Sequence, residues 1–246
     1  MVQVLLDNTD LNYGAWVPVW EVEFIPEQGL GPMKMGQAVL SKYPLSKNVR
    51  IGLQEVSDQD ALTRYFYLDR CIQRVEVDLG SQPLVVLNNH PDAYSSDGTK
   101  KIQIEAILAE GLGIGGLALV GGDFNAVPPG TLQLEGFADD PEELEGRGIE
   151  IVDYLNDGDE MPLDFYEHYA PAVPLEVYQE DTVEGQSAFF THSIASDVFW
   201  TRKLDYLFSS TGWTESQTVQ SPGDGTETAS MDLSDHAPIW GVMEVE

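Results

Sequence analysis

Two residues that could do chemistry follow directly after the apolar run 117–120. Two glycines end that run, and Asp123 and Asn125 come next, ahead of two prolines. On a strand, residues two apart present their side chains on one face. A carboxylate and an amide at a strand end can hold a metal ion, a water molecule and a phosphoryl oxygen. Because Gly, Asn, Asp and Pro also dominate turns, an ordinary turn is the alternative for this pair taken alone.

A second polar pair, Asp235 and His236, stands just before the apolar stretch 239–245. Adjacent residues on an ideal strand point to opposite faces, so these side chains can converge only in a turn. Pro238 stiffens that turn by restricting the residue before it. A carboxylate beside a histidine can supply a metal ligand and a proton acceptor. A surface turn is again the alternative.

Two single residues complete the candidate set. His90 closes the near-continuous apolar run 83–90, which is typical of a strand buried on both faces. It could also be no more than a polar strand end. Asp205 stands between Leu204 and Tyr206, and an unpaired buried carboxylate is costly. We therefore expect Asp205 to have a partner, such as a histidine N–H.

The elements that must position these residues are mostly strands. Alternating or continuous apolar patterns predict strands at 12–16, 20–24, 36–44, 49–56, 64–79 (long and bent), 83–90, 116–125, 203–208 and 236–245. Helical spacing or composition predicts helices at 2–10, 99–110 (closed by Gly111) and 148–155. Residues 170–190 look like a long loop. Many strands with few helices suggest a layered α/β sandwich.

Charge is the most unusual feature of the composition. The 246 residues include 42 acidic and 12 basic ones, for a formal net charge of −30. Such a surface repels nucleic acid and anionic membranes at low salt, and solvation by an acidic face is its simplest interpretation. A polyanionic substrate would need a local basic patch, a metal ion or high salt.

Other compositional features exclude several classes. Cys71 is the single cysteine, which excludes an internal disulfide, and the apolar Ile72 beside it indicates a packed thiol and not a catalytic one. No run of about 18 apolar residues indicates a membrane span. Residues 1–16 lack the basic-then-apolar layout of a signal peptide.

Five segments, in this order, carry a resemblance to a known family. They are GQAVLSKYP (36–44), VVLNNHPDAYSSDGTKKIQ (85–103), GGDFN (121–125), KLDYLF (203–208) and SDHAP (234–238). The series resembles the endonuclease/exonuclease/phosphatase superfamily, the fold of pancreatic deoxyribonuclease, bacterial sphingomyelinases and inositol-phosphate phosphatases. The resemblance implies a four-layer α/β/β/α sandwich of two packed, mostly antiparallel sheets. It also implies hydrolysis of a phosphoester with Mg²⁺ or Mn²⁺.

The resemblance also implies roles for the residues before position 130. His90 would stabilise the phosphoryl oxygens or assist the leaving group. Asp123 would orient or deprotonate the attacking water, and Asn125 would position that water and the phosphate. A bound divalent ion lowers the pKa of water and neutralises charge on the phosphoryl oxygens.

Three later residues take the remaining implied roles. His236 would contact the phosphoryl group and act as a base, with Asp205 fixing its tautomer. Asp235 would belong to the metal side of the site, together with Asp123. Carboxylate and amide oxygens suit a hard cation such as Mg²⁺.

The chain departs from the family pattern at its beginning. Family members start with a strand carrying an Asn, a helix, and a strand ending in Gln-Glu, whose Glu is the main metal ligand. Glu55 in LQEV looks like that residue, but it follows segment 36–44 whereas the family motif precedes it, so we do not expect it to bind metal. We expect one domain over 1–246 that lacks its first strand–helix–strand. Localisation would be secreted or periplasmic with a preceding signal peptide, and cytoplasmic otherwise.

Two further motifs are expected to be turns. Residues 111–116 resemble a dinucleotide fingerprint, but they follow a helix and enter a strand, the reverse of what that loop needs. Residues 156–160 resemble a calcium loop with ligands out of register. His168 and His192 match no role.

Function therefore has two interpretations from different classes. The first is a metal-dependent phosphoester hydrolase acting as a phosphodiesterase, nuclease or phosphatase. The second is a catalytically inactive binding module that kept the fold and lost the metal. Candidate substrates are small phosphoesters, lipid headgroups or nucleic acid, and the net charge of −30 favours a substrate smaller than duplex DNA.

Overall fold

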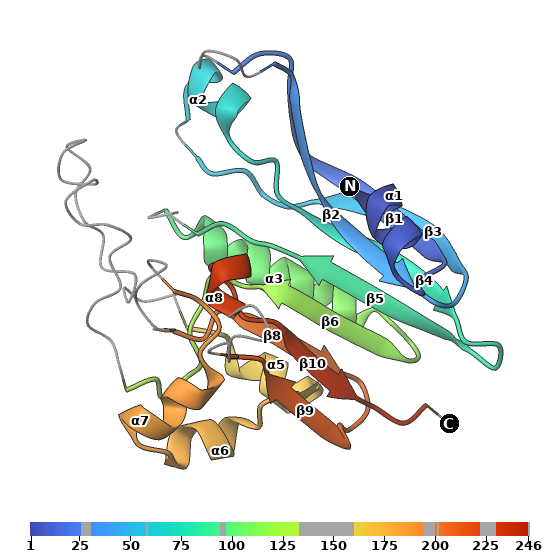
Figure 1. Ribbon diagram of the computed structural model, residues 1–246. Coiled ribbons are helices and arrows are strands. Elements are labelled where there is room, and N and C mark those ends of the chain that lie inside the picture. The colour runs from blue at the N-terminus through green and yellow to red at the C-terminus, as the bar shows by residue number, and fades with distance from the viewer. Residues whose placement is uncertain are drawn as a thin grey trace. The chain divides into compact units, whose positions relative to one another are not determined.

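The computed structural model describes residues 1–25, 31–57, 59–93, 97–132, 160–193, 200, 202–221 and 230–245 (Figure 1). These residues form two compact units, 1–122 and 123–246. The single domain expected over the whole chain stays a prediction. The helix expected at 148–155 lies outside the described residues.

A helix and a long antiparallel strand pair open the first unit. Helix α1 spans Val2–Asn8, and strand β1 (Tyr13–Val22) pairs with β2 (Met33–Ser41). The two strands predicted on either side of Pro18 are one strand, so that prediction was wrong. The register shifts between Pro18 and Trp20, and such a bulge tolerates a proline because it needs no ladder hydrogen bond there.

The larger sheet of this unit is built from the strands β3 (Leu45–Gly52), β4 (Cys71–Asp78), β5 (Pro83–Asn89) and β6 (Ala118–Asp123). The pairs β3–β4 and β4–β5 are antiparallel, whereas β5–β6 is parallel. A parallel pair needs a crossover of a dozen or more residues, and helix α3 (Thr99–Leu112) supplies it. This confirms the predicted helix, which continues to Leu112 because its C-cap is Gly113 and not Gly111.

The long bent strand predicted at 64–79 does not exist. Helix α2 (Ala61–Phe66) occupies its first part, and β4 begins only at Cys71. Asp60 starts the helix by accepting hydrogen bonds from the backbone N–H groups of Leu62 and Thr63. That N-cap satisfies donors that a helix start leaves open, and it explains why a helix forms where the apolar alternation predicted a strand.

Polar and apolar contacts join the elements of the first unit. Arg50 Nε donates to the carbonyl of Pro18 at 2.9 Å, and Asn88 Nδ2 donates to the carbonyl of Ala38 at 3.2 Å. These bonds tie the β1–β2 pair to the larger sheet. Cys71 is fully buried, and burial raises the pKa of its thiol. The expectation of a packed thiol is thereby confirmed.

Gly122 allows two strands to approach closely at the end of β6. Its φ is 141°, and a Cβ there would lie 2.0 Å from the carbonyl oxygen of Asn89. A side chain would therefore clash with the backbone of β5 and strain its own backbone. The glycine that precedes Asp123 is required by this packing.

The second unit is made of short elements. They are α5 (Leu163–His168), β7 (Ala170–Pro171), α6 (Leu175–Glu180), α7 (Val183–Gln186), a 3₁₀ turn η1 (Ser187–Phe189), β8 (Asp205–Ser209), β9 (Glu215–Thr218), α8 (Ser230–Leu233) and β10 (Ile239–Val242). Strand β7 pairs with β8 and β9 with β10, both antiparallel.

The long loop expected at 170–190 is largely helical. Helix α6 follows Pro174, and its Tyr178 is 1% exposed in a cluster with Val173 and Phe190. Helices of this length are not stable alone and depend on tertiary packing. Their sequence pattern is too short to be distinguished from a loop, which explains the wrong prediction.

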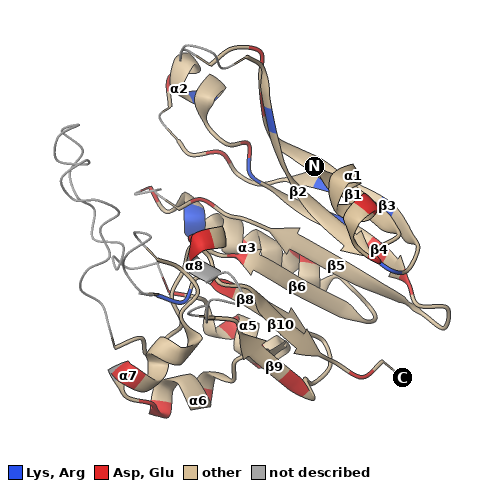
Figure 2. Cartoon of the chain, viewed as in Figure 1, with Lys and Arg blue, Asp and Glu red and all other residues tan. Residues whose placement is uncertain are grey.

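Acidic residues are spread over both units, whereas basic residues are few (Figure 2). In the first unit several cations pair with acids, for example Lys34 with Glu21 at 3.0 Å and Arg74 with Glu110 at 2.5 Å. Within the described part of the chain, no helix combines the length and apolar character needed to cross a membrane.

Candidate active site

The segment after β6 forms a turn that depends on Asp123. Strand β6 ends at Asp123, and Asn125 has a left-handed backbone with φ of 50°. The backbone N–H of Asn125 donates to Asp123 Oδ1 at 2.8 Å, a local bond typical of aspartate turns. The strand alternation expected to place both side chains on one face is therefore wrong here, because Asn125 lies beyond the strand.

The other carboxylate oxygen of Asp123 faces His236. The distance from Asp123 Oδ2 to His236 Nε2 is 3.8 Å, and the distance from His236 Nδ1 to Asp205 Oδ2 is 2.8 Å. The imidazole thus lies between two carboxylates of the second unit. Because an ionised carboxylate only accepts hydrogen bonds, Nδ1 carries a proton and donates to Asp205. The partner expected for Asp205 is confirmed.

These neighbours change the acidity of His236. Burial lowers its pKa, but the hydrogen bond to Asp205 and the negative charges of Asp205, Asp123 and Asp235 outweigh that effect and raise the pKa to about 9. In the metal-free protein the ring is therefore positively charged at neutral pH. A cation at this position suits an anionic phosphoryl group.

Replacing Asp205 with asparagine should lower the pKa of His236 toward its ordinary value of 6.5. The amide removes the charge and weakens the bond that stabilise the imidazolium. The measurement is an NMR titration, in metal-free buffer, that follows the ring protons of the four histidines as the pH changes. As a control, Asp164→Asn removes an exposed charge from α5 and should leave the titration in place.

The same shift has a consequence for stability. The folded-state pKa of about 9 lies above the ordinary 6.5, so the pair contributes stability that is fully present below pH 6.5 and is lost as the pH rises through 9. The free energy of unfolding of Asp205→Asn should differ from wild type more at pH 6 than at pH 9.5, two values chosen on either side of this window. An unchanged His236 titration in Asp205→Asn would contradict this assignment.

Two residues that the sequence analysis did not single out hold Asp205 in place. Thr191 Oγ1 accepts hydrogen bonds from the backbone N–H groups of Leu204 (2.9 Å) and Asp205 (3.0 Å). Lys203 is 3% exposed, and its Nζ donates to the carbonyl of Asp205 at 2.7 Å. Burial lowers the pKa of Lys203 to about 7, although the charge of Asp205 opposes this. The sequence signal that could have singled out Lys203 is its place directly beside an apolar strand.

Asp235 belongs to a different cluster. One oxygen of Asp235 and one ring nitrogen each of His192 and His236 lie within 4.8 Å of one another. Asp123, Asp205 and His236 form a second such group. His236 belongs to both groups, whereas Asp123 and Asp235 belong to one group each. His192 matched no role in the sequence, because an isolated histidine in a loop carries no spacing signal.

His90 lies in the first unit, directly after β5. Arg70 Nη1 donates to its carbonyl at 3.3 Å. With the amide of Gln37 oriented to suit both neighbours, Gln37 accepts from the N–H of His90 at 2.9 Å and donates to the carbonyl of Cys71 at 3.2 Å. The backbone of His90 is thus held on both sides. Its implied catalytic role stays a prediction.

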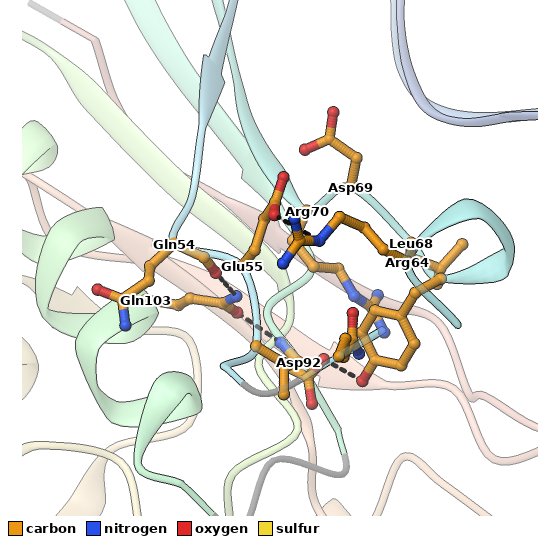
Figure 3. Close-up of a pocket in the computed structure, with 11 residues that line it drawn as sticks. Gln54, Glu55, Arg64, Leu68, Asp69, Arg70, Asp92 and Gln103 are labelled. Carbon is orange, nitrogen blue, oxygen red and sulfur yellow. Dashed lines mark hydrogen bonds and ion pairs between the residues drawn. The ribbon is translucent and has the colours of Figure 1, made fainter. Parts of the chain in front are cut away.

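Glu55 lines a small polar pocket of the first unit (Figure 3). Its Oε2 forms an ion pair with Arg64 Nε at 3.2 Å. Nearby, Gln103 accepts from the N–H of Asp92 at 2.7 Å and donates to the carbonyl of Gln54 at 2.6 Å. The expectation that Glu55 does not bind metal stays a prediction.

Two of the three remaining motifs lie in the described part of the chain. Residues 111–116 begin in the last turn of α3 and lead toward β6, so the segment passes from a helix to a strand as expected. Residues 156–159 lie outside the described part of the chain. His168 is exposed on α5, where its Nδ1 lies 3.0 Å from the carbonyl oxygen of Asp164.

Comparison with known proteins decides the family. Residues 2–236 match the sequence model of the Endonuclease/Exonuclease/phosphatase family. The chain belongs to this family. No curated protein sequence matches it.

Solved structures of the family share the fold. The endonuclease/exonuclease/phosphatase family protein from Leptotrichia buccalis C-1013-b is 16% identical with a TM-score of 0.56, over 99% of this chain and 75% of that one. A truncated Caenorhabditis elegans TDP2 is 14% identical with a TM-score of 0.50, over 96% and 76%. The expected α/β sandwich is confirmed, and phosphoester hydrolase is the functional class that the family supports.

Enzymes of this family generally use divalent metal ions, and the residues here fit such an ion in kind. Asp123 and Asp235 each offer a carboxylate oxygen in a group that includes His236, and Asn125 offers an amide oxygen. Hard cations prefer these ligands. When bound, the ion would supply charge neutralisation at the phosphoryl group and a more acidic water.

Proposed function

We propose that the protein hydrolyses a phosphoester by attack of water on phosphorus, with Mg²⁺ or Mn²⁺ as cofactor. The observation that carries the proposal is the line of Asp205, His236 and Asp123, with distances of 2.8 Å and 3.8 Å along it. A carboxylate that fixes one ring nitrogen leaves the other to act on substrate. In this proposal Asp123, whose Oδ2 faces that nitrogen, orients or deprotonates the water.

The other residues take supporting roles in the proposal. At neutral pH the charged His236 contacts the phosphoryl oxygens, where negative charge develops. Asn125 positions the water and the phosphate, and His90 stabilises the phosphoryl oxygens or assists the leaving group. Asp235 and Asp123 hold the divalent ion.

Surface charge favours a small substrate over duplex DNA. In the described part of the second unit, the basic residues are Arg202 and Lys203, and both are 3% exposed. Proteins that bind duplex DNA place several Lys or Arg side chains on phosphates. We therefore propose a small phosphodiester, a phosphomonoester or a lipid headgroup as substrate.

The rival proposal is a binding module of the same fold without turnover. It is favoured by the placement of Asp123 and Asp235 in separate clusters around His236, since a hard cation needs several oxygens at once. Such a module would bind a phosphoester and leave it intact.

A panel of phosphoesters separates the two proposals. We expect hydrolysis of at least one small phosphoester in Mg²⁺ or Mn²⁺ and its loss when a chelator removes the ion. Plasmid DNA at low ionic strength should be a poor substrate. Binding of a phosphoester that needs no metal ion and gives no product would establish the binding module instead, and efficient nicking of plasmid at low salt would contradict the substrate assignment.

A further inference from the structure

His192 and His236 form a cross-strand pair in the second unit. They are partners in an antiparallel bridge. The backbone bonds lie on either side of the pair, from Ala237 N to Thr191 O at 2.7 Å and from Ser193 N to Asp235 O at 2.9 Å. The pair is therefore of the non-hydrogen-bonded kind, in which opposite side chains come closest. The two ring centroids are 4.7 Å apart.

Asp235 adds an oxygen to this pair. One nitrogen of each ring and one oxygen of Asp235 all lie within 4.8 Å of one another. The ligands of one Zn²⁺, at bonds of about 2.0–2.2 Å, lie roughly 3.3 Å apart in a tetrahedron. Small side-chain rotations would bring the three ligand atoms to the spacing that a tetrahedral zinc site needs. Two imidazoles with one carboxylate suit zinc and late first-row ions, whereas Mg²⁺ prefers oxygens.

Asp205 prepares His236 as a ligand. Its Oδ2 lies 2.8 Å from Nδ1, so Nε2 is the ring nitrogen that would coordinate, and it would release its proton when the metal binds. Histidines that bind metals almost always donate their other ring N–H to a carboxylate, a carbonyl or water. Asp235 is exposed and His192 is half-buried, so an ion from solvent has access to at least one ligand without rearrangement of the backbone.

We propose that His192, Asp235 and His236 bind Zn²⁺ or a similar late first-row divalent ion, and that this ion inhibits phosphoester hydrolysis. The inhibition rests on the proposed function, because the bound ion would occupy Nε2 of His236 and deny it to the phosphoryl group. The binding itself does not depend on that function. With three protein ligands, the fourth position would be left to water.

Binding is tested first, on the full chain stripped of metal. Calorimetric titration with Zn²⁺ should show one equivalent bound with micromolar affinity or tighter, and Co²⁺ should give the visible absorption of a tetrahedral ion. The single variants His192→Gln and Asp235→Asn should each weaken zinc binding at least ~10-fold. That is the scale seen when metal sites lose a supporting group. His168→Gln, which removes an exposed histidine of α5, should bind as wild type.

The results distinguish the existence of the zinc site from its proposed effect on hydrolysis. Absence of stoichiometric binding, or wild-type affinity in both His192→Gln and Asp235→Asn, would overturn the site. In the activity assay, micromolar Zn²⁺ in excess Mg²⁺ should suppress the wild-type rate, and His192→Gln should need at least ~10-fold more zinc relative to its own zinc-free rate. Tight binding that leaves the rate unchanged would overturn inhibition. If no substrate is hydrolysed at all, the proposed function fails while calorimetry still decides the zinc site.

Discussion

Replacing His236 with alanine is expected to lower kcat for phosphoester hydrolysis by at least ~10²-fold. The substitution removes the ring that lies 2.8 Å from Asp205 and 3.8 Å from Asp123. It also removes the positive charge that these carboxylates stabilise, since they raise the pKa of His236 to about 9 against the opposing effect of burial. Steady-state kinetics on the best substrate of the panel measures the loss.

The matched control is His168→Ala, because His168 is exposed on α5 and stands outside both clusters around His236. Its turnover should stay within about twofold of wild type, as expected of surface substitutions. Wild-type turnover in His236→Ala would contradict the assignment.

The double variant with Asp123→Ala sharpens this test. Residues that act as one unit are strongly non-additive in catalysis. If His236 and Asp123 act on the same water and phosphoryl group, the double variant should be little slower than the slower of the two single variants. Multiplied losses would show that the two residues act independently, against the mechanism proposed here.

Replacing Phe124 with alanine is expected to reduce the free energy of unfolding by about 3–5 kcal/mol. Phe124 is fully buried and stands between Asp123 and Asn125 in the chain. Its ring meets Phe165, Tyr206 and Phe208 edge-on, with centroids 5.4, 5.5 and 6.1 Å away. Removal leaves a cavity and loses the aromatic contacts. Urea denaturation measures the change.

Phe24→Ala provides the control, because Phe24 is 60% exposed in the first unit. It should change stability by no more than about 0.5 kcal/mol. Phe124→Leu keeps most of the buried volume and should lose clearly less than Phe124→Ala. A loss below about 1 kcal/mol in Phe124→Ala would show that the cluster relaxes around the cavity, and that the turn carrying Asp123 does not depend on it.

Much of the fold was readable from local patterns. The buried strands β5 and β6 and helix α3 between them were predicted because apolar runs and helical spacing are properties of contiguous residues. The errors arose where longer-range or weaker signals decide. Asp60 is the N-cap of α2, and that helix covers the first residues of a segment predicted as a strand. Tertiary packing of Tyr178 stabilises α6 where the composition indicated a loop.

The sequence by itself determined which residue types stand at the candidate site and in what order. Asp123, Asp205 and His236 each stand within a short motif that can be recognised locally, and the cost of burying Asp205 already required a partner. Only the tertiary structure decided which groups meet. It paired His236 with Asp205 across 31 residues and placed His192 opposite His236 across a bridge. Such contacts depend on strand register, and register is set by the packing of whole elements and not by the residues that it brings together.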